Sequence, residues 1–326
     1  MKRKKIHGII LIFLIAIFLA ACGGNEDKGT SNENDGENLD ADIVTIATGG
    51  SSGPYNILGT TIGELYSSEF GVNSRTQTTG ASVENANLMK DGKIEMAFMM
   101  SDVVTEAVEG EGNFDEPIDN INQIAALYPN YVQIVTTANS GIETFKDLKG
   151  KRIAVGDQNS GVEVNARNLL EGHDITYDDI EVDYLGYAEA ADGLKAGQID
   201  AAFLTSGLPN ASLMELSETL DIKLVTIEPE EVERIAQEKE YFIPMEIPED
   251  TYGNDKSIPT AAIMNALVVN ADTSEDDVYK LTKTFFDNLD KLESSHQSAS
   301  DISLEGAQEG LVAPLHPGAE RYYNEQ

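Results

Sequence analysis

Five short turns rich in glycine, serine and threonine follow predicted strands, and each presents several backbone N–H groups. They are Gly49–Gly53, Thr79–Ser82, Ser101-Asp102, Asn159–Gly161 and Ser206-Gly207. Successive N–H groups at the start of a helix bind anions, and glycine allows a ligand to approach them closely. Ordinary helix capping explains any one of these turns alone. Because five occur in one chain, all after strands, together they predict a ligand cleft.

Four side chains near these turns are further candidates. Glu163 ends the sequence Ser160-Gly-Val-Glu163, which has capping-box spacing, so its carboxylate either caps a helix or accepts from a ligand ammonium group. Tyr128 either lays its ring against a ligand or belongs to the core. Asn85 and Arg75 either face the cleft or, in the case of Arg75 especially, face solvent.

The turn Gly49-Gly-Ser-Ser-Gly53 also matches G-x-S-x-G, the nucleophile elbow of α/β-hydrolases. It follows the first predicted strand, and none of His173, His296 and His316 has a recognisable catalytic context. No H-E-x-x-H, Walker loop or Cys/His metal spacing occurs. The sequence therefore predicts a binding protein rather than an enzyme, with no metal and no cofactor. A serine hydrolase that uses Ser51 remains an alternative.

Strands and helices alternate along the chain from Ile43. Apolar β-rich runs such as Ile43–Ala47, Met96–Met100 and Arg152–Val155 are each followed by a polar turn and a helical pattern. Such βαβ alternation gives parallel-cored sheets covered by helices, with right-handed crossovers. The sequence therefore predicts the α/β class.

One stretch of the sequence is repeated. Over nineteen residues from Val83 and from Ala188, eight identities fall in register, among them Gly92/Gly197, Phe98/Phe203 and Ser101/Ser206. Each copy reads as a helix, a glycine, a short apolar strand and a serine. Chance convergence on this common pattern is the alternative to two similar lobes.

These patterns predict two α/β lobes that face one another across a cleft. Lobe I comprises residues 43–134 and 266–326, and lobe II comprises 135–265. The chain crosses between the lobes at Tyr131–Thr137 and returns at Ala262–Val269, and we expect these two crossings to act as a hinge. A loop poor in regular structure is predicted over Phe242–Pro259, and a helix over Asp277–Leu292.

The first residues predict export and lipid attachment. A basic head and the apolar run Ile9–Ala21 have the form of a signal peptide over residues 1–21. The run ends Leu-Ala-Ala-Cys22, which is similar to a bacterial lipobox, so Cys22 is predicted to carry the lipid that anchors the protein to the outer face of the cell membrane. Residues 22–42 are polar and predicted to form a flexible tether.

The chain is strongly acidic, with a formal net charge of −35. Removal of residues 1–21 leaves 18 basic and 57 acidic residues, a net charge of −39. Such a field repels nucleic acids and anionic membrane surfaces, so neither is predicted as a partner, apart from the membrane that holds the lipid anchor. Solubility in a saline or alkaline exterior explains the acidity more simply than a specific cation function.

Seven stretches of the mature chain together resemble TAXI-type solute receptors of the tripartite ATP-independent periplasmic (TRAP) transporters. They are ATGGSSGPY (47–55), TTGASVENANLM (78–89), AFMMSDVVTEAVEG (97–110), ALYPNYVQIV (126–135), DLKGKRIAVGDQNSGVEVNARNLL (147–170), EAADGLKAGQIDAAF (189–203) and ISLEGAQEGLVAPLHPGAERYY (302–323). The resemblance implies a two-lobed type II periplasmic-binding-protein fold. It also implies that the protein captures a small organic anion or amino acid, glutamate-like, for a TRAP-type membrane permease.

The resemblance places many residues in the cleft by matching position. They are Gly50, Ser51, Ser52, Gly53, Tyr55, Thr79, Gly80, Ala81, Ser82, Ser101, Asp102, Tyr128, Ser160, Gly161, Val162, Glu163 and Ser206. We expect the backbone N–H groups of 51–53, 79–81 and 160–162 to hold one ligand carboxylate between the lobes. The substrate receptor of an ATP-driven importer has the same lobes and remains the alternative. The turn Asp157-Gln158-Asn159 is more polar than is usual in the TAXI receptors.

Overall fold

Strands and helices alternate through residues 38–326, the part of the chain that the computed structural model describes. The strands are β1 Ile43–Ala47, β2 Asn73–Gln77, β3 Met96–Met100, β4 Ile121–Thr137, β5 Arg152–Ala154, β6 Glu181–Asp183, β7 Ala201–Ser206, β8 Ile222–Val225, β9 Ile243–Ile247 and β10 Ile258–Asn270. The α-helices are α1 Pro54–Phe70, α2 Ser82–Lys90, α3 Ser101–Glu109, α4 Gly161–Gly172, α5 Tyr187–Lys195, α6 Ala211–Thr219, α7 Pro229–Ala236, α8 Glu275–Phe286, α9 Leu289–Ser295 and α10 Pro317–Asn324. Short 3-10 helices lie at η1 Phe145–Leu148, η2 Tyr177–Asp179, η3 Gln297–Asp301 and η4 Gly306–Gln308.

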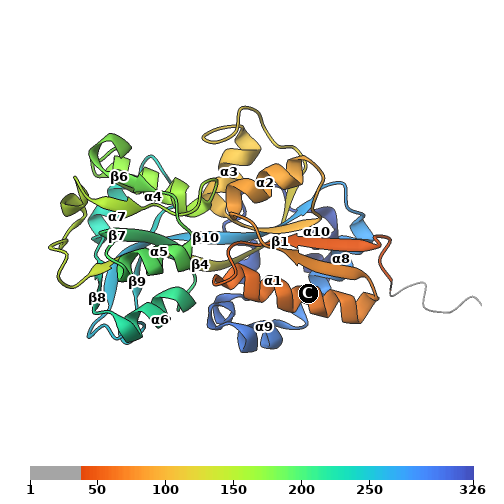
Figure 1. Ribbon diagram of the computed structural model, residues 1–326. Coiled ribbons are helices and arrows are strands. Elements are labelled where there is room, and N and C mark those ends of the chain that lie inside the picture. Colours follow the sequence, from red (N-terminus) through yellow and green to blue (C-terminus); the bar gives the residue numbers. More distant parts are fainter. Residues whose placement is uncertain (1–37) are drawn as a thin grey trace, which may run out of the picture. The chain divides into compact units, whose positions relative to one another are not determined.

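The predicted α/β class and two-lobed arrangement are confirmed. The strands form one sheet in the order β2-β1-β3-β10-β4-β7-β5-β6, with β8 beside β4 and β9 beside β10. In lobe I, β1 runs parallel to β2 and β3; in lobe II, β5 runs parallel to β6 and β7. The antiparallel strands β4 and β10 lie between these two parallel groups (Figure 1).

The long strands β4 and β10 join the lobes. β10 pairs with β3 of lobe I through residues 265–269 and with β9 through residues 258–262, while β4 pairs with β7 of lobe II through residues 131–136. β4 begins at Ile121, ten residues before the predicted strand, because Pro129 is accommodated beside a register shift in the β4–β10 pairing. The predicted lobe boundaries fall inside these two strands and stay predictions.

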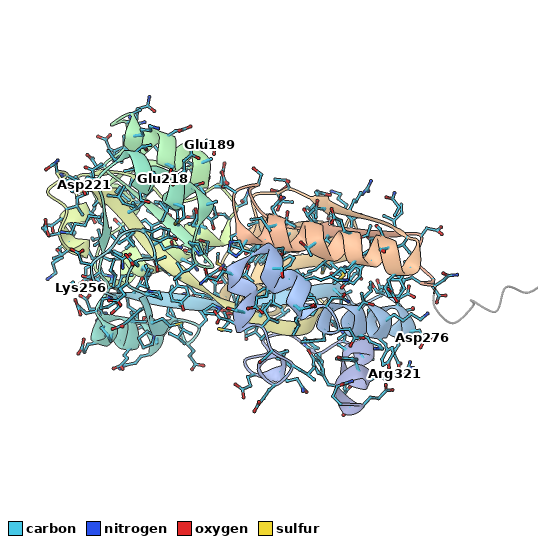
Figure 2. The ribbon with its side chains drawn as sticks, turned by 90° about the horizontal axis from the view of Figure 1, so that it is seen from below. Glu189, Glu218, Asp221, Lys256, Asp276 and Arg321 are labelled. Atoms are coloured by element: carbon cyan, nitrogen blue, oxygen red, sulfur yellow. The ribbon has the colours of Figure 1, made fainter. Side chains whose placement is uncertain are left out.

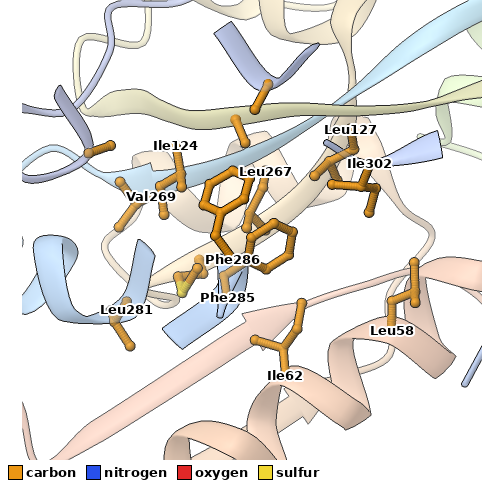
Figure 3. Packing of buried hydrophobic residues seen from close by; sticks show 14 of the residues in the cluster. Leu58, Ile62, Ile124, Leu127, Leu267, Val269, Leu281, Phe285, Phe286 and Ile302 are labelled. Carbon is orange, nitrogen blue, oxygen red and sulfur yellow. The ribbon is translucent and has the colours of Figure 1, made fainter. Parts of the chain in front are cut away.

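Helices cover both faces of the sheet in lobe I. Alternate residues of β3 point to opposite faces, so Phe98 packs with α1 and α8 while Met99 packs with α2 and α3. Figure 3 shows Phe285 and Phe286 of α8 within the first of these clusters, beside Ile62 of α1. Burial of each such side chain contributes about 1.5–3 kcal/mol, so this core fixes where the strand ends lie.

The sequence repeat corresponds to one supersecondary unit used in both lobes. α2 and β3 occupy in lobe I the place that α5 and β7 occupy in lobe II, and both strands pair parallel to one neighbour and antiparallel to another. Gly92 and Gly197 adopt φ angles of 63° and 65° just after their helices, a left-handed conformation that favours glycine. Phe98 and Phe203 each point into the core of their own lobe.

The structure corrects two predicted elements. Residues 243–247, within the predicted loop, form β9 and pair with β10 although Pro244 interrupts the run. The helix predicted to continue beyond residue 286 instead ends at Phe286 and restarts as α9. In the described residues no helix has the length and apolar character needed to cross a membrane. The predicted signal peptide, Cys22 and most of the tether lie outside the described residues.

The charged side chains labelled in Figure 2 come from both lobes, among them Glu218 and Asp221 from lobe II and Asp276 and Arg321 from lobe I. Arg321 of α10 is paired with Asp276 of α8 at 2.6 Å, and the two side chains lie together in the picture. Both groups are about half exposed or more, so this pair adds at most about 1 kcal/mol.

Candidate functional site

A cavity of about 580 Å³ lies between the lobes, where the carboxyl ends of the parallel strands meet. Lobe I contributes the turn after β1 with the start of α1, the turn after β2, and the end of β3. Lobe II contributes the turns after β5 and β6 and the end of β7. We call this cavity the cleft.

Many of the predicted site residues line the cleft. They are Gly50, Ser51, Ser52, Gly53, Tyr55, Thr79, Gly80, Ala81, Ser160, Val162 and Ser206. The others lie behind the lining: Ser82, Asn85, Ser101, Asp102, Tyr128, Gly161 and Glu163. The structure thus brings the turns together at one place, while contact of any of these residues with a ligand stays a prediction.

Asn85 and Ser82 hold the lobe I turns in place. The buried Asn85 amide donates to the carbonyl oxygens of Thr48 and Phe98, at 2.7 and 2.9 Å, and its Oδ1 accepts from the Thr79 hydroxyl at 2.6 Å. Ser82 Oγ accepts from the Met100 N–H at 3.1 Å. Both side chains therefore position the lining of the cleft from behind it.

The Glu163 carboxylate does not cap the helix, and its contact with a ligand stays a prediction. Its carboxylate accepts from the Tyr177 hydroxyl at 2.8 Å and from Arg167 Nε at 3.3 Å, and Glu163 does not line the cleft. The helix cap comes from Ser160, whose Oγ accepts from the Glu163 N–H at 3.1 Å. The Ser160 N–H instead donates to the Asp157 carbonyl oxygen at 3.2 Å.

Asp102 joins the lobes instead of facing the cleft. It is fully buried at the start of α3, and Asn165 of α4 in lobe II donates its Nδ2–H to Asp102 Oδ2 at 2.5 Å. Burial raises the pKa of the Asp102 carboxyl group to about 7, and the nearby Glu106 adds to this increase. Ser101, beside it, is buried and does not line the cleft.

Tyr128 belongs to a buried network beneath the cleft. Its carbonyl oxygen accepts from Asn265 Nδ2 at 2.7 Å, and Asn265 Oδ1 accepts from Asn130 Nδ2 at 2.8 Å and from the Tyr55 hydroxyl. Burial raises the pKa of both tyrosines well above its usual value, so both remain neutral. Tyr55 and Asn130 of this network line the cleft.

Only some of the backbone N–H groups expected to bind a ligand carboxylate are free to do so. Four of the groups already donate within their own turns: Gly53 to the Gly50 carbonyl at 3.0 Å, Gly80 to Glu84 Oε2 at 2.7 Å, Ala81 to Thr79 Oγ1 at 3.0 Å and Ser160 to the Asp157 carbonyl at 3.2 Å. Within the described residues, the N–H groups of Ser51, Ser52, Gly161 and Val162 donate to no partner. These groups sit at the starts of α1 and α4, where an anion is favoured.

Sequence reasoning missed the acidic side of the cleft. Asp157 and Glu189 both line it, and no Lys, Arg or His does so among the described residues. Burial raises the pKa of the Asp157 carboxyl group, and the carboxylates of Glu189 and Glu84 raise it further. Arg75 lies elsewhere, on β2, where its Nε donates to Thr45 Oγ1 at 3.4 Å.

Tyr184, Tyr187, Asn130 and Thr205 were also missed as lining residues. The Tyr187 hydroxyl donates to the Thr205 carbonyl oxygen at 2.6 Å, which fixes its ring across from Gly53. The rule that polar turns follow strands would have found residues 184–189, because they follow β6 and include Gly186.

The lobes touch along one side of the cleft. The Glu84 N–H of α2 donates to the Asn159 carbonyl oxygen at 3.2 Å. A Cβ atom on Gly161 would stand 2.9 Å from both Met100 Sδ and Ser82 Oγ, so a side chain at this position would push lobe I away. The absence of a side chain at Gly161 therefore permits this arrangement of the lobes.

The geometry does not assemble a serine hydrolase. No histidine of the described residues lines the cleft beside Ser51. His173 stacks on Phe145 with ring centroids 3.8 Å apart, and His296 and His316 each accept from a nearby backbone N–H group at 3.1 Å. Among the described residues, Ser51 therefore has no histidine beside it to act as a base.

Solved structures of similar shape share this fold. A binding protein component of an ABC phosphonate transporter from Pseudomonas aeruginosa is 13% identical, with a TM-score of 0.54, and the match covers 81% of this chain and 80% of that one. PhnD1 of Prochlorococcus marinus, in complex with methylphosphonate, is 12% identical with a TM-score of 0.53, covering 79% and 88%. A protein of Bordetella bronchiseptica is 17% identical with a TM-score of 0.52, covering 89% and 84%. At these identities the likeness shows the two-lobed fold of periplasmic solute-binding proteins.

The identification with the TAXI-type TRAP receptors is wrong. The family model that matches residues 46–326 is that of the NMT1-like family, and the transporter named among the similar structures is of the ABC type. Of the quoted stretches, 47–55, 78–89 and 147–170 contribute turns and helix starts to the cleft, whereas 302–323 lies outside it. Because the matched region spans nearly all of the described residues, the chain belongs to the NMT1-like family.

Proposed function

We propose that the protein captures a small solute in the cleft and delivers it to a membrane importer. The cleft of about 580 Å³, lined from both lobes at the carboxyl ends of their strands, is the observation that supports this most directly. Its volume lies in the range of roughly 300–1,000 Å³ that suits small ligands. A solute that contacts both lobes favours the closed arrangement, because its full set of contacts exists only there.

The chemistry of the lining suits a small carboxylate or an amino acid. The N–H groups of Ser51, Ser52 and Val162 can donate to a carboxylate, and Val162 belongs to the first turn of α4, where the helix dipole favours negative charge. Tyr55, Tyr184 and Tyr187 provide apolar ring surface for the carbon skeleton. We expect a bound solute to form no covalent bond, because no histidine of the described residues lines the cleft beside Ser51.

Small solutes should stabilise the purified mature protein against heat. A solute at a hundred times its dissociation constant adds about 2.7 kcal/mol to the free energy of unfolding, which a thermal-shift screen detects. We expect a hit among amino acids, carboxylates, phosphonates and sulfonates, with calorimetry giving one site per chain. Mass spectrometry of material released from the purified protein by denaturation should find the same solute. If no class of small solute raises the melting temperature, the receptor function is wrong.

We propose an ABC-type importer as the membrane partner, replacing the TRAP permease. The support is the shared fold with the ABC transporter component from Pseudomonas aeruginosa. We also propose that the receptor works outside the cytoplasm, tethered by lipid at Cys22, on the strength of the lipobox-like sequence.

Uptake of the bound solute into cells should therefore require ATP and persist when an ionophore collapses the ion gradients. The variant Cys22→Ser should move the receptor from the membrane fraction to the soluble fraction or leave it unprocessed. Uptake that stops with the ionophore while ATP remains high would contradict the ABC partner, and a Cys22→Ser protein that stays lipid-modified would contradict the anchor.

A further inference from the structure

We propose that the cleft selects solutes that carry a protonated amino group, which Asp157 and Glu189 hold from lobe II. This inference rests on the proposed receptor function and narrows its ligand class. It separates amino acids and amines from carboxylates, phosphonates and sulfonates that lack an amino group. Its grounds are the geometry of the two carboxylates, the absence of cationic side chains in the lining, and two buried oxygen atoms without partners.

Asp157 and Glu189 converge on one point of the cleft wall. A Cβ atom on Gly186 would stand 2.8 Å from Asp157 Oδ2 and 2.8 Å from Glu189 Oε2, so glycine at 186 leaves both carboxylates in place. Glu189 Oε2 accepts from the Gly186 N–H at 3.0 Å, which fixes that carboxylate at the start of α5. Two carboxylates side by side attract a cation between them.

The protein itself supplies no cation to this pair. Neither Asp157 nor Glu189 has a salt-bridge partner among the described residues, and the lining there contains no Lys, Arg or His. Burial raises the pKa of the Asp157 carboxyl group, as expected for a carboxylate that lacks a counter-charge. A ligand ammonium group would provide that charge, whereas a ligand anion placed beside the pair would add a third negative charge.

Asn130 provides a second and independent requirement for a hydrogen-bond donor. The Tyr128 carbonyl oxygen can only accept, so Asn265 must present its NH2 to it and its Oδ1 to Asn130. Asn130 therefore presents its NH2 to Asn265, and this fixes Asn130 Oδ1 as an acceptor. That oxygen is buried and has no partner among the described residues, in a side chain that lines the cleft.

Thr205, at the end of β7, provides a second oxygen of this kind, although its hydroxyl can donate as well as accept. Its hydroxyl oxygen is buried and without a partner in the described residues, and Thr205 also lines the cleft. An unpaired buried acceptor is destabilising, and a ligand N–H would remove that cost. Because Asn130 Oδ1 requires a hydrogen-bond donor, a primary ammonium group fits better than a quaternary one, which has no hydrogen to donate.

Matched pairs of probes test the inference by calorimetry on the mature protein. The pairs are L-glutamate with glutarate, L-alanine with propionate and γ-aminobutyrate with butyrate, accompanied by putrescine, trimethylglycine, methylphosphonate and methanesulfonate. We expect the amino member of at least one pair to bind at least about tenfold more tightly than its partner. Binding of glutarate, methylphosphonate, methanesulfonate or trimethylglycine without binding of any N–H-bearing amine would overturn the inference and leave the receptor function standing. If no probe binds, both the selectivity for an amino group and the proposed receptor function fail.

The variant Asp157→Asn then assigns the effect to a residue. It should weaken the amino probe about tenfold to a hundredfold and leave the probe without an amino group unchanged or bound more tightly. Glu181→Gln is the matched control, because it removes one negative charge from an exposed position of the same lobe outside the cleft. Glu189→Gln provides a second test if Asp157→Asn unfolds. Equal losses for both members of a pair would overturn the assignment.

Discussion

Replacement of Gly161 by valine is expected to reduce solute affinity at least about a hundredfold. Gly161 opens α4 of lobe II, and a Cβ atom there would stand 2.9 Å from Met100 Sδ and from Ser82 Oγ in lobe I. Both neighbours are buried, so they cannot move aside without disturbing the end of β3. Valine would therefore wedge the lobes apart and disfavour the closed arrangement that a bridging solute needs.

Calorimetry with the solute identified in the screen measures this loss, and Gly161→Ala should give an intermediate value. The control is Gly63→Ala within α1, where a Cβ atom would lie 3.4 Å from Ser74 Oγ in the same lobe, an ordinary contact. Arg75→Ala should also leave affinity unchanged, because Arg75 lies outside the cleft. Wild-type affinity in a folded Gly161→Val protein, or a large loss in Arg75→Ala, would contradict this account of the lobe contact.

The position of the cleft was predictable because a single rule governs it. In a parallel α/β sheet the strand ends, the polar turns and the helix starts all lie at one edge. The turns at 49–53 and 79–82 and the residues at 160–162 were therefore found from strand and turn patterns alone, and they meet around the cleft. The same rule applied to the turn after β6 would have added Tyr187 and Glu189.

The roles of individual groups were not predictable, because each depends on partners distant in the chain. Glu163 has the spacing of a capping box, yet Tyr177 and Arg167 take its carboxylate. The Gly80 N–H, expected to bind a ligand, donates to Glu84. Convergence of Asp157 and Glu189 requires β5 and β6 to lie side by side, a pairing that no local pattern reveals.

The transporter partner was the least predictable feature. Several of the stretches that resembled TAXI receptors, such as 47–55 and 78–89, form turns and helix starts of the cleft, and such turns follow from the fold. This is why motif similarity supported the two-lobed fold while the comparison with the NMT1-like family overturned the TRAP assignment.

Replacement of Asn265 by alanine is expected to lower the free energy of unfolding by about 3 kcal/mol or more. Asn265 lies on β10, is almost fully buried, and bonds the Tyr128 carbonyl oxygen, Asn130 Nδ2 and the Tyr55 hydroxyl. Alanine leaves these three groups buried and without that partner, and each such group costs about 1–3 kcal/mol. The drop in the free energy of unfolding should therefore exceed the drop that replacement of a typical asparagine by alanine causes.

Chemical denaturation of the purified protein measures this change, and Asn56→Ala is the matched control. Asn56 also bonds two neighbours, Thr48 Oγ1 at 3.2 Å and Thr78 Oγ1 at 3.1 Å, but it is only partly buried, so water can replace its partners. We expect a loss of about 1 kcal/mol or less for the control. Equal losses of unfolding free energy in the two variants would contradict the stabilising role of the buried network around Asn265.

Because Tyr55 and Asn130 both line the cleft, Asn265→Ala should also weaken solute binding. The buried network therefore supports both the cleft lining and the pairing of β4 with β10.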